Sequence, residues 1–281
     1  MAPWNGLLDR IRPKAYGRRP PLVLVNGLAE QHESWFLNKR FWGRHFDVYL
    51  PNILVYDGPV LHARIQAKQP ITVDYLVEEL REFVERFVQR PPYHLVASSL
   101  GGKVAVEFAA RYPHLVSRMV LLCPSGMGDE EQLPIMEGVM RNDMHSVVRS
   151  VFHKSRFVDR DIVKYYKLSL DNRKWKTGLL RTIRGQKEFT VRDKMKLVQC
   201  PTLLVTGEND RICDPATAEQ AAKELPDGFF LNIPGCGHAP QIEKHFYVNR
   251  LVRYFLLASR PAAPPKLSQL LLSKPRRVAA K

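Results

Sequence analysis

Residues 93–111 read YHLVASSLGGKVAVEFAAR, a stretch that passes from a strand pattern into a helical one. The mostly apolar run at 93–97 is typical of a buried strand, and residues 100–111 continue with helical spacing. The same alternation recurs along the chain. Further strands are predicted at 22–26, 46–50, 118–123, 202–206 and 229–233, and helices at 73–89, 215–224 and 243–257. Such alternation indicates an α/β fold, with a mostly parallel sheet covered by helices on both faces.

Strand patterns stop between residues 127 and 195. Four helical patterns follow there instead, at 131–141, 145–153, 159–169 and 174–183. A helical block inserted between two strands predicts a cap over the carboxyl ends of the strands, where ligands bind in such folds. The predicted organisation comprises an α/β core at 21–126 and 196–259, a helical cap at 127–195, a basic N-terminal segment at 1–20 and a basic, Pro-rich tail at 260–281 that we expect to be disordered.

Composition limits the possible classes of protein. With 45% hydrophobic and 25% charged residues over 281 positions, the chain is long and apolar enough to bury a core. It has no run of 18 apolar residues that would predict a transmembrane helix, and its start lacks the apolar segment of a secretory signal. The four cysteines form no CxxC pair, which argues against a zinc site and a disulfide framework. We therefore expect a cytoplasmic protein with free thiols.

The net charge of +15 is unevenly distributed. Residues 1–20 carry +4, residues 127–196 carry +6 and residues 260–281 carry +6, so the predicted core is nearly neutral. A nucleic-acid-binding domain usually carries such charge on its folded body, so no specific nucleic-acid partner is predicted. For the tail at 260–281, a solvated segment and a weak peripheral contact with an anionic membrane are the two alternatives.

Ser99 is the predicted nucleophile. It lies between the strand and the helix in the pattern small-x-Ser-x-Gly, with Ala97 and Gly101 at the small positions. A tight turn of this kind exposes one hydroxyl at the end of the sheet. The same spacing around Ser98 would place the larger Val96 and Leu100 there, so Ser98 is the poorer candidate. The alternative is an ordinary strand–helix turn in which Ser99 only caps the helix.

A serine hydroxyl is a weak nucleophile that needs a base, and the base needs a third group to orient it. Residues 203–210 read LLVTGEND, a strand followed by a loop that ends in Asp210, the predicted acid. Residues 234–240 read PGCGHAP, a glycine-rich loop that contains His238, the predicted base. We expect Gly235 and Gly237 to leave room for the imidazole to swing toward Ser99.

Two other acidic residues compete with Asp210 for this role. Glu208 is the fallback acid because it lies in the same loop, and Asp129 is a weaker candidate that follows an earlier strand.

Acyl transfer also needs two backbone N–H groups to hold the negative charge that develops on the carbonyl oxygen. The amide of Leu100 directly follows the nucleophile, and the amide of Leu28 lies in the loop after the first strand. Gly27 permits the turn that directs the second amide. These two N–H groups form the predicted oxyanion hole.

Over residues 20–260 the chain resembles the α/β-hydrolase superfamily. The resemblance rests on four motifs: NGLAEQHESW at 26–35, HLVASSLGGKVAVEFAARYP at 94–113, LLVTGENDRI at 203–212 and GCGHAPQIEKHFYVNRLVRYFL at 235–256. It implies an eight-stranded, mostly parallel sheet with a helical cap between the sixth and seventh strands. It also implies that Ser99, Asp210 and His238 are the catalytic triad and that no metal or organic cofactor takes part.

The segment MVLLCPSGMG at 119–128 additionally resembles the subgroup that cleaves carbon–carbon bonds in ring-fission products. Enzymes of that subgroup usually place a large aromatic residue after the catalytic histidine, where this chain has Ala239. The residue before Gly27 is Asn26 rather than the usual histidine. The serine nucleophile argues against dehalogenase and epoxide-hydrolase chemistry.

Three functions remain open: hydrolysis of a carboxylic ester or lipid, hydrolysis of a carbon–carbon bond, and ligand binding without catalysis. The complete triad favours an enzyme acting on a small acyl or ester substrate through an acyl-enzyme. The residues predicted to line its pocket are Met136, Met140, Tyr166 and Trp175, with packing inside the cap as the alternative. Arg149, Lys164 and Arg181 are candidates to bind a substrate carboxylate, or they are merely solvated.

Overall fold

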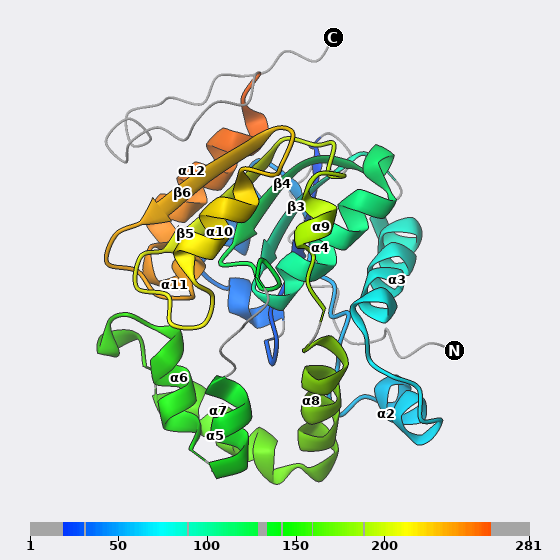
Figure 1. The fold of residues 1–281 in the computed structure, drawn as a ribbon, viewed down its shortest axis with the longest axis vertical. Helices are drawn as coiled ribbons and strands as arrows, with labels where there is room; N and C mark the ends of the chain where they lie inside the picture. The colour runs from blue at the N-terminus through cyan, green and yellow to red at the C-terminus, as the bar shows by residue number, and fades with distance from the viewer. Residues whose placement is uncertain are drawn as a thin grey trace.

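Figure 1 shows the chain as a computed structural model, which describes residues 19–30, 32–88, 90–128, 134–141, 143–158, 160–187 and 189–259. The predictions for residues 1–18 and for the tail at 260–281 lie outside these ranges. Within them, no helix is long and apolar enough to cross a bilayer.

Six parallel strands form one sheet in the order β2-β1-β3-β4-β5-β6. The strands are β1 (Pro21–Val25), β2 (Asp47–Tyr49), β3 (Tyr93–Ser98), β4 (Val116–Leu122), β5 (Thr202–Gly207) and β6 (Gly228–Ile233). The register aligns Val25 with Ala97 and Gly207 with Ile233. Since all strands run the same way, the loops that follow β1, β3, β5 and β6 meet at one edge of the sheet.

The predicted α/β fold class is confirmed, but the described residues form six strands rather than eight. Within the described residues, no strand precedes β1, and after β6 the chain continues in helices to Leu257.

Helices cover both faces of the sheet because the strand side chains are apolar in both directions. Val23 and Val25 pack with α3 (Val73–Phe83) and α4 (Leu100–Arg111) on one face. Leu22 and Leu24 pack on the other face, where Trp42 and the apolar side of the last long helix complete the core. The other helices of the core are α1 (Lys39–Trp42), α2 (Pro59–Gln66), α9 (Arg192–Met195), α10 (Pro215–Ala222), α11 (Pro240–Glu243) and α12 (His245–Leu257). The helix predicted at 73–89 ends as α-helix at Phe83 and continues as a π-helical turn, Val84–Val88.

The connection from β4 to β5 contains a helical segment of four helices, α5 (Pro134–Arg141), α6 (Met144–Val151), α7 (Arg160–Asp171) and α8 (Arg173–Gln186), followed by the short α9. In Figure 1 they lie together at the lower end of the molecule, beyond the carboxyl ends of the strands. Because the described sheet has two strands fewer than expected, this segment follows the fourth strand rather than the sixth.

The helical segment is tied to the core at two points that matter for the site. The Tyr166 hydroxyl donates to the carbonyl of Ala29 at 3.2 Å, and the amide of His238 donates to the carbonyl of Val151 at 2.8 Å. α7 is therefore bonded to the loop after β1, and α6 to the loop after β6.

Candidate active site

Ser99 occupies a strained turn between β3 and α4. Its φ is +50° and its ψ −120°, a conformation that a non-glycine residue adopts only when its surroundings enforce it. Its amide donates to Leu122 at 3.1 Å, and its carbonyl accepts hydrogen bonds from Gly102 and Ser125. The Ser99 side chain makes no helix-capping hydrogen bond and lines a cavity instead. These contacts favour the exposed-hydroxyl interpretation over the capping one.

The small residues around Ser99 are explained by close backbone approach. A Cβ atom on Gly101 would lie 2.5 Å from the carbonyl oxygen of Val25, and one on Gly102 would lie 2.6 Å from Cβ of Pro124. Neither contact is compatible with a larger residue. Ser98 is 1% exposed, and its hydroxyl accepts a hydrogen bond from Gln241 at 3.4 Å, so it points into the core.

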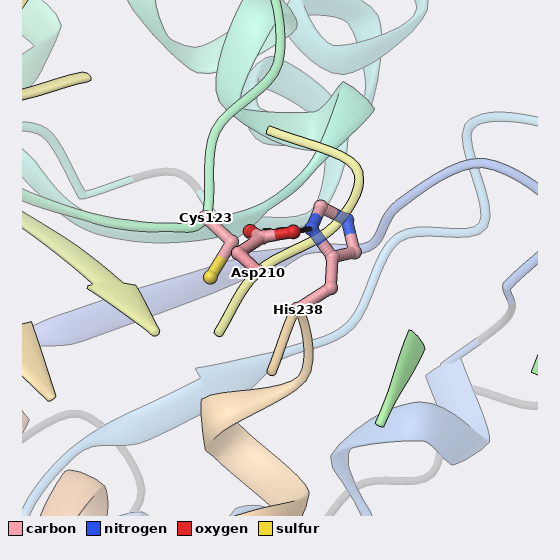
Figure 2. A group of neighbouring side chains, drawn as sticks. All are labelled: Cys123, Asp210 and His238. Carbon is pink, nitrogen blue, oxygen red and sulfur yellow. Dashed lines mark hydrogen bonds and ion pairs between the residues drawn. The ribbon is translucent and has the colours of Figure 1, made fainter. Parts of the chain in front are cut away.

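Asp210 and His238 lie in the loops after β5 and β6, which are paired strands. The His238 Nδ1 atom is 2.9 Å from Oδ2 of Asp210 and 3.1 Å from Oδ1. The amides of Ile212 and Cys213 donate to the same Oδ1 at 2.9 and 3.1 Å. Asp210 is thereby fixed, and it orients the imidazole so that Nε2 points away from the carboxylate (Figure 2).

The pKa values of the pair move in the directions expected of an acid that holds a base. Burial alone would lower the pKa of His238, but the Asp210 carboxylate and the Cys213 side chain outweigh it and raise that pKa well above its ordinary value. Burial would raise the pKa of Asp210, but His238 and the two backbone amides hold it below its usual range. The pair therefore stabilises an imidazolium ion. No hydrogen bond joins the Ser99 hydroxyl to His238 within the described residues, although both line the same cavity.

The loop around His238 is fixed rather than free to swing. A Cβ on Gly237 would lie 2.6 Å from the amide nitrogen of His153 and 2.7 Å from the carbonyl oxygen of Val151. Gly237 is thus small because the end of α6 packs against it, not because the imidazole needs space. Gly235 has a φ of +57°, which suits glycine at a turn. The alternative acid Glu208 accepts a hydrogen bond from the amide of Gly235 at 3.1 Å, and Asp129 lies outside the described residues.

Cys123 is a neighbour of the pair that the sequence analysis did not single out. It follows β4 with a φ of +46°, is fully buried, and lies beside the Asp210 carboxylate in Figure 2. One ligand atom each of Cys123, Asp210 and His238 lies within 4.8 Å of the others. Burial and the charge of Asp210 raise the pKa of the thiol well above its usual value, so the thiol stays protonated. A metal ion held here would have to displace that proton and the one on His238 Nδ1.

The predicted oxyanion amides both lie at the cavity. Leu28 and Leu100 line it, and within the described residues neither backbone N–H donates a hydrogen bond. Other amides of the same two loops do donate hydrogen bonds. The amide of Ala29 donates to the Tyr56 hydroxyl at 2.9 Å, and the amide of Gly102 donates to the carbonyl of Ser99 at 2.8 Å. The amide of Leu100 is at the start of α4, where helix N–H groups lack intrahelical partners.

The cavity has a volume of about 540 Å³ and lies between the strand ends and the helical segment. Most of its wall is apolar or aromatic: Leu28, Phe36, Val147, Val148, Val151, Phe152, Ile162, Tyr165, Tyr166, Ile212 and Ile242. Three carboxylates also line it, those of Glu30, Glu33 and Asp161. A wall of this kind suits an uncharged acyl chain.

Of the four side chains predicted to line a pocket, only Tyr166 does so. Trp175 is buried and packs its ring against Tyr56 and Tyr166, and Met136 packs on the core. Met140 is 73% exposed. The lining residues of α6 that were missed show helical spacing at 147, 148 and 151, but spacing alone does not tell which apolar face meets a cavity.

The basic residues proposed to bind a carboxylate are also elsewhere. Arg149 and Lys164 line a second hollow, on the other side of α6 and α7, and Arg181 is exposed on α8.

Comparisons with known proteins agree with this architecture. A model of the alpha/beta hydrolase family matches residues 22–250. Monoacylglycerol lipase ABHD6 of Homo sapiens is 20% identical over 260 residues, covering 85% of this chain and 76% of that protein. Carboxylesterase CesB (YbfK) from Bacillus subtilis superposes with a TM-score of 0.69 at 20% identity, covering 87% of this chain and 86% of that chain. The meta-cleavage product hydrolase CumD from Pseudomonas fluorescens IP01 gives a TM-score of 0.70 at 17% identity, covering 85% and 92%.

Proposed function

This chain belongs to the alpha/beta hydrolase family, and from that premise we propose that it is a serine hydrolase that cleaves carboxylic esters with an apolar acyl chain. The observation that carries the proposal is the joint placement of Ser99 and His238. Ser99 lies in a strained turn at a cavity, and the same cavity is lined by His238, whose Nδ1 is held 2.9 Å from Asp210. Lipases and esterases among its relatives support the same reaction type.

The proposed reaction has two steps. His238 accepts the Ser99 proton at Nε2 while Oγ attacks the acyl carbon, and the amides of Leu28 and Leu100 hold the oxyanion. The alcohol leaves with the proton from His238, which produces an acyl-enzyme. A water molecule, deprotonated by His238, then releases the acid. Asp210 keeps the imidazole in the reactive tautomer and stabilises its charged form throughout.

The helical segment α5–α8 is proposed to act as the cap that sets substrate choice. α6 and α7 contribute most of the apolar wall, including Val148 and Ile162. Tyr166 is the one predicted pocket residue that lies in this wall. Its hydroxyl donates a hydrogen bond from α7 to the loop after β1, which contains Leu28. A substrate would therefore contact the cap and the oxyanion loop at once.

Carbon–carbon hydrolysis of ring-fission products is the less favoured alternative. Such substrates carry a carboxylate, which needs a cation in the pocket. Among the described residues that line the cavity, His238 is the only basic side chain, and the other charged groups are acids. The cavity thus favours an uncharged acyl group over an anionic one.

Labelling with a fluorophosphonate probe tests the proposed nucleophile. We expect the parent and Ser98→Ala to be labelled and Ser99→Ala to remain unlabelled, with all three showing the same thermal unfolding. A folded parent that resists the probe would instead point to ligand binding without catalysis. Simple aryl esters then separate ester hydrolysis, which we expect, from cleavage restricted to vinylogous diketones.

A peripheral contact of the basic tail, 260–281, with an anionic membrane also remains a proposal. We expect removal of the tail to weaken sedimentation with phosphatidylserine vesicles and to leave ester hydrolysis unchanged. Equal sedimentation of the full-length and shortened chains would contradict it.

A further inference from the structure

The cavity beside Ser99 has the opposite charge to the chain around it. The protein has 43 basic and 28 acidic residues, yet the carboxylates of Glu30, Glu33 and Asp161 all line this one cavity. Among the described lining residues there is no lysine or arginine. A solvated surface with the average composition of this chain would carry more basic than acidic side chains. The local charge therefore bears on what the cavity binds.

Glu30 is a carboxylate that lies close to the predicted nucleophile. A Cβ atom placed on Gly27 would be 3.0 Å from Cβ of Ser99 and 3.4 Å from Cδ of Glu30, so the two side chains flank the same glycine. The distance from Cδ of Glu30 to Cβ of Ser99 is thus comparable to the length of a small alcohol. The group attached to the scissile ester oxygen would lie within reach of Glu30.

The position of Glu30 is built into the oxyanion loop. Its Oε2 accepts a hydrogen bond from the amide of Gly27 at 3.2 Å, and its carbonyl accepts one from Nδ2 of Asn26 at 2.7 Å. Both partners immediately precede Leu28, whose N–H is a predicted oxyanion donor. The side chain is consequently held in one place and is not a mobile surface acid.

The carboxyl is also poorly solvated. Burial raises the pKa of Glu30, an effect that the hydrogen bond from Gly27 and the nearby charge of His238 reduce but do not cancel. A negative charge at this place opposes the oxyanion that forms beside Ser99, because like charges in a site of low polarity repel strongly. A substrate that brings a positive charge to Glu30 removes this penalty, whereas a substrate with a second negative charge increases it.

We propose that Glu30 forms a subsite for the alcohol part of the ester and selects alcohols that carry an ammonium group over neutral ones, and neutral ones over anionic ones. This inference rests on the proposed ester hydrolysis. The assignment to the alcohol part follows from the rest of the wall, since the apolar residues of α6 and α7 suit the acyl chain. The specificity residue is thus in the loop after β1 and not in the helical segment.

The test compares butyrate esters of choline, ethanol and glycolate, which share the acyl group and differ in the charge of the alcohol. In the parent we expect kcat/KM to fall in that order, by about tenfold or more between the first and the last, the range seen when a buried charge loses its partner. Glu30→Gln keeps an acceptor for the Gly27 amide and should reduce this ratio to near one. In Glu30→Gln, the loss of kcat/KM for the choline ester should come mainly from a higher KM, as expected when a binding group is removed.

Two matched variants make the test specific. Glu219→Gln makes the same chemical change on α10, where Glu219 is half exposed, and should keep the parent ratio. Asp161→Asn removes another carboxylate from the cavity wall. If Asp161→Asn lowers the ratio as much as Glu30→Gln does, the selectivity belongs to the whole cavity and the Glu30 subsite is wrong. An unchanged ratio in Glu30→Gln, with fluorophosphonate labelling at the parent rate, would also overturn it.

A binding measurement separates this inference from the proposed reaction. In Ser99→Ala, tryptophan fluorescence would follow the binding of octyltrimethylammonium and of octanoate. We expect the cation to bind more tightly, and Glu30→Gln in the same background to remove the difference. If no ester is hydrolysed but this preference is present, the proposed reaction fails and the subsite stands. If esters are hydrolysed without any charge preference, the subsite fails alone.

Discussion

Two hollows of similar size lie on opposite sides of the α6–α7 pair and differ in charge. The inner one, of about 540 Å³, is the cavity at Ser99, with an apolar and acidic wall. The outer one, of about 530 Å³, is lined by basic and small groups: His145, Arg149, Ser155, Val158, Arg160, Val163, Lys164 and Lys167. No acidic side chain is among its described lining residues.

The helix α7 contributes side chains to both walls. On α7, residues 161, 162, 165 and 166 face the inner cavity, while residues 160, 163, 164 and 167 face the outer hollow. The two sets follow the helical period and are offset by about half a turn. The net charge of +15 is therefore no guide to the substrate, because the helix directs its cations away from the site. Substitutions that treat the two hollows in parallel test this division.

The largest expected difference concerns the nucleophile. Ser99→Ala should lower kcat for an aryl ester by about 10⁴-fold or more, as removal of a triad serine does in other hydrolases. Ser150→Ala offers a matched loss of a hydroxyl on α6, where Ser150 only bonds to the carbonyl of Val147. Steady-state kinetics with both variants check the contrast. Equal activity of the parent and Ser99→Ala would place the chemistry elsewhere.

Asp210→Asn should have the next largest effect, a loss of about 10³- to 10⁴-fold in kcat, because the imidazole loses the acceptor that fixes its tautomer. Glu208→Gln, in the same loop, tests the alternative acid and should keep nearly full activity. A reversal of these two results would make Glu208 the acid. Circular dichroism of both variants separates loss of function from loss of fold.

The pH dependence provides a second measurement on the same pair. His238 must be neutral to accept a proton, and its pKa is raised well above 6.5, so activity should be lost as the pH falls through that raised value. The acid limb of kcat/KM in the parent should thus lie above pH 6.5. Since Asp210 causes most of the upward shift, the residual activity of Asp210→Asn should show this limb at lower pH. A limb at or below the ordinary histidine value in the parent would contradict the coupling.

A volume change compares the two hollows without changing charge. Val148→Trp should fill part of the inner cavity and lower kcat/KM for octanoate esters by about tenfold or more, with little effect on acetate esters. Val163→Trp places the same bulk in the outer hollow and should not change the octanoate-to-acetate ratio. If both variants change that ratio alike, the acyl chain does not lie in the inner cavity alone.

The smallest expected effect concerns the outer cations. Arg149→Ala combined with Lys164→Ala should leave kcat/KM for neutral esters within about twofold, because surface charges away from the site have small effects. A much larger loss would mean that the two hollows do not work separately.

The parts of the molecule that could be predicted are those in which one residue meets a strict local demand. Gly101 and Gly102 must be small because they contact Val25 and Pro124, so the turn at Ser99 is visible as a pattern of residue types. Asp210 and His238 each follow a strand, and strands β5 and β6 are paired. Neighbouring strands bring the ends of such loops together whatever lies between them.

The parts that could not be predicted depend on how separate elements pack. Met140 is as apolar as Val148, yet Met140 is 73% exposed and Val148 is buried at the cavity. Their difference depends on how α5 and α6 pack against the rest of the molecule, which no local pattern encodes. Glu30 was not predicted as a site residue for a similar reason, because only the fold places its carboxyl beside Ser99. The role of Gly237 depends on α6, which is far from it in sequence.

The contact between Gly237 and the end of α6 has a consequence for anyone who wishes to exchange parts between hydrolases. The loop that carries His238 and the helix that walls the cavity share a hydrogen bond and a surface with no space for a side chain between them. A helical segment transplanted from another scaffold would therefore dock correctly only if the acceptor's histidine loop had glycine at the matching place. The helical segment and this loop form one module, although the chain separates them by α9, β5, α10 and β6.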